Sequence, residues 1–436
     1  MRDAGRIAAA IEIIDAIETR HRPARNAVKE WGRDHRFAGS GDRAWIGGLV
    51  LDTLRYKSSV AFAMGADTPR ALVLGTAARI WGWTPEDFAS KFEGDEHAPE
   101  PVTPEEAEGF IRDISKAPLA VQGDFPAWAE KSLSRVFGKD VLAEAQAFSS
   151  RAPVDLRVNA LKVQGEKAMV AVSSKIPTAQ AGALSAACIR IPQNNPTGKN
   201  APAESIPAYG RGWVEVQDEG SQIAGLAAGA QPGHQVLDFC AGAGGKTLEL
   251  SAMTGNAGQV YAWDVDWKRL RAIFPRLQRA GARNVQVRDG DESTLTDLEG
   301  KMDVVFVDAP CTGAGTWRRR PDAKWRLSED QLNQRIEQQD EALDNAAKYV
   351  KPGGRLVYVT CSIFAEENAD RIEAFLGRDG DFEQRSTLDA IKASGGLVEG
   401  AETVLATCAD AAGALQLSPL RTETDGFYIA VLERVG

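Results

Sequence analysis

The chain has 436 residues, 43% of them hydrophobic, and a formal net charge of −10, which is the composition of a globular protein with more than one domain. No run of about 18 apolar residues is present to span a bilayer, and the acidic residues among the first twenty argue against a secretory signal. The cysteines are irregularly spaced, which predicts free thiols in a reducing cytoplasm rather than disulfides or a metal site; they are Cys188, Cys240, Cys311, Cys361 and Cys408.

Positive charge is concentrated in three segments despite the acidic total. Residues 268–288 hold seven Lys or Arg and no carboxylate, residues 317–326 hold five against one Asp, and residues 20–57 hold nine against four acids. Local clusters, not the net charge, decide whether a polyanion can bind. Any one cluster could be a solvated helix face, but the three together favour a nucleic-acid partner.

The first 150 residues show helical patterns. Apolar side chains recur at helical spacing at Ile7, Ile11, Ile14 and Ile17. Two Thr-Pro pairs, at 84–85 and 103–104, are each followed by two acids and predict helix starts. Short alternating strands follow at 155–161, 187–191 and 213–216. We therefore expect a helical domain over residues 1–140 and a small α/β domain over residues 141–215.

From residue 216 onward, strand-like and helical segments alternate. The predicted strands are 236–239, 260–263, 285–287, 303–307, 356–359 and 427–431. Several of them are almost continuously apolar, as strands of a parallel sheet covered on both faces are. The pattern predicts a doubly wound, Rossmann-like α/β domain over residues 216–436.

A glycine-rich turn follows the first of these strands, in the sequence LDFCAGAGGKT at 237–247. Glycine lets a backbone approach a ligand closely, and the start of the next helix attracts negative charge. Asp264 ends the following strand about twenty residues later, where a carboxylate can accept hydrogen bonds from ribose hydroxyls. This combination favours a nucleoside cofactor over a purely structural turn.

Two common nucleotide-binding patterns do not fit this turn. A P-loop requires glycine where Cys240 stands, and a dinucleotide fingerprint requires glycine or alanine where Thr247 stands. S-adenosyl-L-methionine, which has no pyrophosphate, is therefore the predicted cofactor.

Two cysteines follow neighbouring strong strands. Cys311 ends the sequence Asp-Ala-Pro-Cys that begins at Asp308, and Cys361 lies between Thr360 and Ser362. Because the carboxyl ends of parallel strands share one edge of the sheet, we expect two thiols and a carboxylate beside the cofactor loop. A single cysteine is usually an inert core residue, but two at one pocket favour function. We expect the basic surroundings to lower the pKa of these thiols, and Cys240 to pack or contribute backbone contacts.

These motifs resemble those of the RsmB/Sun (RsmB/NOP) family of S-adenosyl-L-methionine-dependent RNA cytosine-5 methyltransferases. Residues 151–162 are similar to the strand that opens the family's small N1, RRM-like domain, and residues 31–37 and 41–43 resemble a shortened NusB-like RNA-binding domain. One departure is Ala243, where the family commonly has proline. The matching motifs, in chain order, are 237–247, 308–315, 318–325, 359–362 with 366–368, and 425–427.

The resemblance implies a role for each matching residue. Cys361 corresponds to the nucleophile that attacks C6 of cytosine, Asp308 to the acid that holds the cytosine edge, and Cys311 to the cysteine that assists breakdown of the covalent adduct. Asp289 is an alternative to Asp291 on the adenine side. The implied cofactor contacts are Cys240, Ala241, Gly242, Ala243, Gly244, Gly245, Lys246, Asp264, Asp291 and Asp308.

The resemblance therefore implies a monomeric, cytoplasmic enzyme without a metal that makes 5-methylcytosine in RNA, with 16S (small-subunit) rRNA as its substrate. The target base must be unstacked, which is easiest in single-stranded RNA. The alternatives are a cytosine-5 methyltransferase acting on tRNA or DNA, and a non-catalytic RNA-binding factor of ribosome assembly. An RNA-binding factor does not need Cys361, Asp308 and the glycine loop together.

Overall fold

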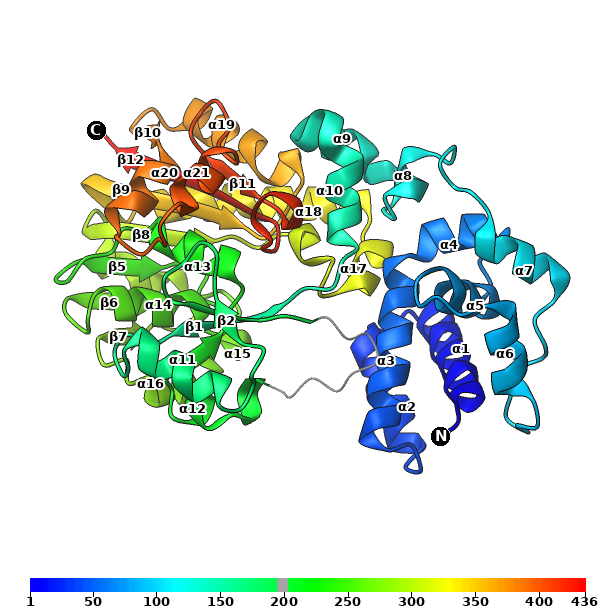
Figure 1. Ribbon diagram of the computed structural model, residues 1–436. Helices are drawn as coiled ribbons and strands as arrows, with labels where there is room; N and C mark the ends of the chain where they lie inside the picture. The colour runs from blue at the N-terminus through cyan, green and yellow to red at the C-terminus, as the bar shows by residue number, and fades with distance from the viewer. Residues whose placement is uncertain (194–202) are drawn as a thin grey trace. The chain divides into compact units, whose positions relative to one another are not determined.

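The computed structural model describes residues 1–193 and 203–436 (Figure 1). The chain divides into two compact units. Unit 1 contains Met1–Arg151 and the distant segment Trp317–Leu327. Unit 2 contains Ala152–Pro192, the described residues from 203 to 316, and Ser328–Gly436. The division into domains at residues 140 and 215 stays a prediction.

Unit 1 is helical, as the sequence predicts. The predicted helix starts are confirmed: the hydroxyls of Thr84 and Thr103 each accept a hydrogen bond from the third residue of the helix, with proline in the first position. Helices α1, α3 and α5 form the centre of the core, with Ile14, Leu49 and Leu72 fully buried. The helices are α1 Asp3–Arg20, α2 Ala24–Asp34, α3 Ser40–Arg55, α4 Lys57–Met64, α5 Pro69–Arg79, α6 Pro85–Phe92, α7 Pro104–Ile111, α8 Leu119–Gln122, α9 Glu130–Phe137, α10 Val141–Phe148 and α17 Pro321–Arg326.

The segment Trp317–Leu327 is an internal part of unit 1. The Trp325 indole donates to the Leu54 carbonyl at 2.6 Å, and the Lys324 amine donates to the Arg55 carbonyl at 2.7 Å. Both carbonyls lie in the last turn of α3, where the helix itself supplies no donor for them. Arg318 and Lys324 are only 3% and 2% exposed. The prediction of an exposed basic cluster at 317–326 is therefore wrong for these two residues, because both are packed inside the unit.

Unit 2 contains, among the described residues, an eight-stranded sheet in the order β10-β12-β9-β8-β5-β6-β7, with β11 paired to β12. Strands β5 to β9 run parallel and β10, β11 and β12 pair antiparallel. All six predicted strands are confirmed. The strands are β5 Gln235–Asp238, β6 Gln259–Ala262, β7 Val285–Val287, β8 Met302–Asp308, β9 Val350–Thr360, β10 Phe382–Arg385, β11 Leu415–Leu417 and β12 Phe427–Arg434.

Helices cover both faces of this sheet, so the predicted doubly wound fold is confirmed (Figure 1). Successive residues of β8 point to opposite faces. Val304 and Phe306 join a core with α13 Glu219–Leu226, α14 Gly245–Met253, α20 Thr387–Ala393 and α21 Ala401–Ala406. Val305 and Val307 join a second core with α18 Glu329–Ala347 and α19 Ala369–Arg378. Three further helices follow β4 in the chain: α15 Trp267–Leu270, α16 Ile273–Ala280 and α22 Pro419–Thr422.

A smaller antiparallel sheet, in the order β2-β3-β1-β4, precedes the large one in the chain. The three strands predicted in this region are confirmed as β1 Val154–Val158, β3 Cys188–Ile191 and β4 Val214–Val216, and β2 adds Gln180–Ala181. Helices α11 Gly165–Ser173 and α12 Pro207–Gly210 lie in the same region of the chain. Within the part of the chain that the structure describes, no helix combines the length and the apolar character needed to cross a membrane.

Candidate active site

The predicted site residues gather at one edge of the large sheet. From β5, the chain adds β6 and β7 on one side and later β8 and β9 on the other, and ligands of doubly wound folds bind at such a reversal. Asp264 follows β6, Asp308 is the last residue of β8, and Cys361 directly follows β9. The strand-end prediction is therefore confirmed for these residues.

The glycine loop between β5 and α14 has a conformation that only glycine adopts easily. Gly242 and Gly244 have φ of +53° and +84°. A Cβ on Gly242 would lie 3.0 Å from the Arg269 guanidinium, and one on Gly244 would lie 2.3 Å from Ile273. A Cβ on Gly245, the first residue of α14, would meet no atom within 4 Å. The loop therefore leaves open space directly at a helix N-terminus.

Asp264 holds this loop in place. It is 5% exposed, and its two oxygens accept hydrogen bonds from the backbone N–H of Gly242 and of Asp266, both at 2.8 Å. The Ala243 carbonyl accepts a hydrogen bond from Arg276 at 2.6 Å. Arg276 thus restrains the loop at the position where the family commonly has proline.

Asp238 is a buried carboxylate beside the loop that the sequence pattern did not single out. One oxygen accepts a hydrogen bond from the Thr247 hydroxyl at 2.6 Å, and the other has no partner among the described residues. Burial raises the pKa of Asp238 to about 7. The glycine pair, the open helix start and these acids are a donor and acceptor set that fits a nucleoside cofactor without a pyrophosphate.

The two candidates for the adenine-side acid are both exposed. Asp291 accepts a hydrogen bond from the Ser293 N–H at 2.9 Å, and Asp289 accepts one from the Gly290 N–H at 2.7 Å. Each carboxylate stabilises its own turn, and a role for either in cofactor binding stays a prediction.

Lys246 contacts Asp308. Its ammonium lies 3.1 Å from one Asp308 oxygen and over the rings of Phe306 and Phe427, at 5.8 and 5.5 Å. The lysine is 6% exposed, whereas the Asp308 side chain is 33% exposed. Although burial opposes it, the charges of Asp308 and Glu249 raise the pKa of Lys246 and keep it an ammonium. A buried cation thus holds one oxygen of a carboxylate that solvent can reach.

The two predicted thiols lie in direct contact. The sulfur atoms of Cys311 and Cys361 are 3.4 Å apart and form a hydrogen bond. That hydrogen bond and burial raise the pKa of the Cys311 thiol, and burial raises the pKa of the Cys240 thiol. The expectation that basic surroundings lower the thiol pKa is therefore wrong for Cys311. The charges nearest to Cys240 and Cys311 are largely carboxylates, with Glu367 acting on Cys311.

Exposed cations remain in the other two basic segments. In unit 2, Arg276 and Arg279 pair with Glu215, and Arg288 pairs with Asp297, which leaves the exposed side chains of Lys268, Arg269, Arg271 and Arg283. In unit 1, a hollow of about 560 Å³ is lined by Asn26, Lys29, Glu30, Gly32, Arg33, Arg36 and Arg43. These surfaces retain the charge that a phosphate backbone requires.

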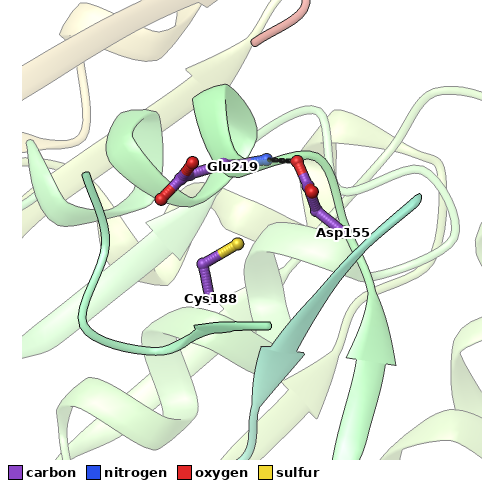
Figure 2. Close-up of side chains that lie close together, drawn as sticks. All are labelled: Asp155, Cys188 and Glu219. Carbon is purple, nitrogen blue, oxygen red and sulfur yellow. Dashed lines mark hydrogen bonds between the residues drawn. The ribbon is translucent and has the colours of Figure 1, made fainter. Parts of the chain in front are cut away.

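A third group of polar residues joins the small sheet to α13. Asp155, Cys188 and Glu219 bring their ligand-type atoms within 4.8 Å of one another (Figure 2). Arg190 donates to both Asp155 oxygens, at 2.9 and 3.0 Å, and lies 3.2 Å from a Glu219 oxygen. Burial raises the pKa of the Cys188 thiol, which disfavours the thiolate that a metal would need. We assign this group to ion pairing between the two elements.

Comparisons with known proteins agree with this geometry. A family model described as 16S rRNA methyltransferase RsmB/F matches residues 226–433. The probable ribosomal RNA small subunit methyltransferase B of Synechocystis is 30% identical over 329 residues, which are 74% of this chain and 70% of that protein. The chain belongs to the RsmB/F methyltransferase family. The match to the ribosomal RNA small subunit methyltransferase B of Enterobacter is 33% identical over 60% of each chain, so it spans about three fifths of that relative's length.

Solved structures share the fold of this family member. The crystal structure of PH0851 aligns with a TM-score of 0.74 and 24% identity over 100% of this chain and 99% of that one. A methyltransferase homologue from Pyrococcus horikoshii aligns with a TM-score of 0.57 and 25% identity, over 74% of this chain and 100% of that one. The NSun6 protein of the same organism, solved with SFG, aligns with a TM-score of 0.61 and 18% identity, over 72% and 99%.

Proposed function

We propose that this protein transfers a methyl group from S-adenosyl-L-methionine to C5 of a cytosine in RNA, through a covalent bond between Cys361 and C6. The observation that carries the proposal is the 3.4 Å contact between two thiols at the sheet edge that also bears Asp308. Membership of the RsmB/F family and the names of its relatives support small-subunit rRNA as the substrate. The free thiols that the reaction needs suit a reducing cytoplasm.

The glycine loop, residues 240–246, would hold the cofactor at the start of α14, with Asp264 facing the ribose and Asp291 or Asp289 facing the adenine. Two further groups lie beside the same loop. They are the Asp238 oxygen that has no partner among the described residues, and the Arg269 guanidinium next to Gly242. When bound, S-adenosyl-L-methionine supplies an activated methyl group on a sulfonium. NSun6, which has the same fold, was solved with SFG.

The protein's own residues would make the cytosine reactive. C5 of cytosine is a poor nucleophile, so the Cys361 thiolate first forms a bond to C6, and the displaced electron pair makes C5 nucleophilic. The exposed oxygen of Asp308 would hold the cytosine edge, while Lys246 fixes the other oxygen. After C5 has been methylated, a base removes the C5 proton, the C6–S bond breaks and Cys361 leaves as a thiolate. Cys311, in contact with Cys361, would assist this last step.

Single substitutions of the two cysteines test the separate roles proposed for the two thiols. Cys361→Ala should abolish methylation and form no covalent RNA complex. Cys311→Ala should still attack and transfer the methyl group, and then accumulate an enzyme–RNA species that survives denaturing electrophoresis. Cys408→Ala, which removes a buried thiol in the core of unit 2, is the matched control and should behave as the wild type. Adduct in Cys361→Ala but not in Cys311→Ala would reverse the two roles.

Bisulfite sequencing of total RNA with and without the gene tests the substrate. A single lost 5-methylcytosine in small-subunit rRNA is the expected result, and a lost site in tRNA would favour the alternative enzyme. Full retention of every site, together with RNA binding by the purified protein, would instead support a non-catalytic assembly factor. We also propose that the protein is a monomer, and light scattering of the purified protein tests this oligomeric state.

A further inference from the structure

A single buried carboxylate connects the loops that carry the two cysteines. Glu367 is 0% exposed and lies in the short 3-10 helix Ala365–Glu367, between β9 and α19. One of its oxygens accepts a hydrogen bond from the Thr312 N–H at 2.8 Å, and the other accepts one from the Thr312 hydroxyl at 2.5 Å. The second oxygen also accepts a hydrogen bond from the Ser362 hydroxyl. Thr312 follows Cys311 and Ser362 follows Cys361 in the sequence, so one side chain binds the residue after each thiol.

Other hydrogen bonds hold the same loops from their outer sides. Gln339 of α18 donates to Glu367 and to the Pro310 carbonyl, both at 2.9 Å. Asn368 accepts a hydrogen bond from the Thr360 hydroxyl at 2.5 Å and donates to the Ser362 carbonyl at 3.1 Å. Residues on both sides of each cysteine are therefore fixed. The Glu367 side chain binds Thr312 and Ser362, whose hydroxyls lie 3.5 Å apart.

We propose that Glu367 is the positioning residue that sets the separation of the Cys311 and Cys361 sulfur atoms. Glu367 accepts hydrogen bonds from four donors, which is close to the capacity of a carboxylate. Without it, the Gly315 N–H still donates to the Cys361 carbonyl at 2.9 Å, but the thiols lose their fixed distance. The consequence for turnover rests on the proposed function, whereas the geometry does not.

Two substitutions separate a positioning role from a role of the charge. Glu367→Gln keeps an oxygen for the Thr312 N–H and Gln339, and its amide NH₂ can donate to the hydroxyls of Thr312 and Ser362, which rotate to accept. This variant therefore removes the charge but keeps the connection between the loops. Glu367→Ala removes both. Glu366→Gln, at the neighbouring position, is the matched control.

The first measurement follows the thiols without RNA or cofactor. Hydrogen peroxide oxidises two adjacent thiols to a disulfide and is itself reduced to water, and peptide mapping by mass spectrometry detects the 311–361 disulfide. We expect the disulfide to form at wild-type rate in Glu367→Gln and Glu366→Gln, and about tenfold or more slowly in Glu367→Ala, because small displacements sharply reduce reaction between fixed groups. Wild-type oxidation in a folded Glu367→Ala protein would overturn the proposal.

The second measurement follows the reaction itself. In Glu367→Ala, the covalent RNA adduct should accumulate and kcat should fall by about tenfold to a hundredfold with little change in KM, whereas Glu367→Gln should restore kcat. A Glu367→Gln protein as slow as Glu367→Ala would mean that the charge, not the positioning, matters. Methylation absent from the wild type would refute the proposed function and leave the thiol measurement valid.

Should Glu367→Ala fail to fold, Ser362→Ala removes the hydrogen bond that Ser362 donates to Glu367. The substitution also removes the acceptor of the Phe364 N–H, at 3.1 Å, and the 3.5 Å contact with the Thr312 hydroxyl. This variant should also slow the formation of the 311–361 disulfide, although less than the loss of Glu367. An unchanged rate in Ser362→Ala would contradict the proposed role of the connection.

Discussion

Replacing Asp238 by asparagine should remove part of the pH dependence of the stability of unit 2. Burial, together with the charges of Asp308 and Asp264, raises the pKa of Asp238 to about 7, against the opposing effects of the Thr247 hydrogen bond and the Lys246 charge. The folded chain therefore keeps a proton that the unfolded chain releases near its ordinary pKa of 3.8. Because the folded state binds more protons in this range, its stability is highest at low pH and falls as the pH rises through 7.

The size of the effect follows from the two pKa values. Between pH 5 and pH 7, the free energy of unfolding should fall by about 1.4 kcal/mol per pH unit for this one group. From pH 5 to pH 8 the loss amounts to about 3 kcal/mol. Asp238→Asn carries no titratable group, while its amide oxygen still accepts the hydrogen bond from Thr247. Burial also raises the pKa of Glu249 to about 7, so the variant should reduce the slope rather than abolish it.

Urea unfolding at pH 5, 6, 7 and 8 measures this slope, with pulse proteolysis and mass spectrometry of the peptides that contain β5 to report on unit 2 alone. Glu249→Gln is the matched control and should also reduce the slope, and the double variant should reduce it further, leaving the contribution of other carboxyls with raised pKa values, such as Glu219 and Glu367. An Asp238→Asn protein with the full wild-type slope would refute the reasoning, because Asp238 would then be ionised in the folded chain.

Two further predictions concern ligand binding. Gly242→Ala should weaken binding of S-adenosylhomocysteine by roughly 1–2 kcal/mol, because the φ of Gly242 is +53° and the new Cβ would press on Arg269. Calorimetry measures this affinity. Gly377→Ala, whose Cβ would meet nothing within 4 Å, is the control and should leave the affinity unchanged. Reversing the charges of Lys268, Arg271 and Arg283 should flatten the dependence of RNA affinity on salt by about 0.7 in log–log slope for each phosphate that the protein no longer neutralises. An unchanged slope would make these residues an ordinary solvated surface, and the exposed pair Lys131 and Lys139 serves as the control for net charge.

The fold was predictable where burial imposes a regular pattern on the sequence. Strand β8 is apolar on both faces because helices cover both, and so its sequence stands out. The strands that the pattern did not predict lack this signal. Both residues of β2 are exposed, β10 has one buried residue in four, and β11 has three residues. These strands form because a neighbouring strand offers hydrogen bonds, which is tertiary information.

The site was predictable where a residue's position along a strand determines its place in the fold. Asp308 and Cys361 are examples, since each ends or follows a buried parallel strand. Glu367 lies in the motif 366–368, but its role was not predictable, because its partners Gln339 and Thr312 are 28 and 55 residues away in the sequence. The burial of Lys324 was not predictable either, because its partner, the Arg55 carbonyl, is also distant in the sequence. A lysine that caps the end of α3 has the same sequence pattern as one on a solvated helix face.

The contact between the two thiols depends both on the positions of the strands and on hydrogen bonds between residues distant in the sequence. Strands β8 and β9 are parallel neighbours in which Asp308 lies opposite Val359, and neighbouring strands are about 4.8 Å apart. Cys311 is three residues beyond Asp308 and Cys361 is two beyond Val359, so the sheet alone brings the two loops together. Loops of this kind diverge unless something binds them, because each leaves the sheet with its own backbone freedom. The 3.4 Å contact between the sulfur atoms therefore depends on hydrogen bonds between the loops, and Glu367, which lies in the segment that follows Cys361, accepts two of them from Thr312.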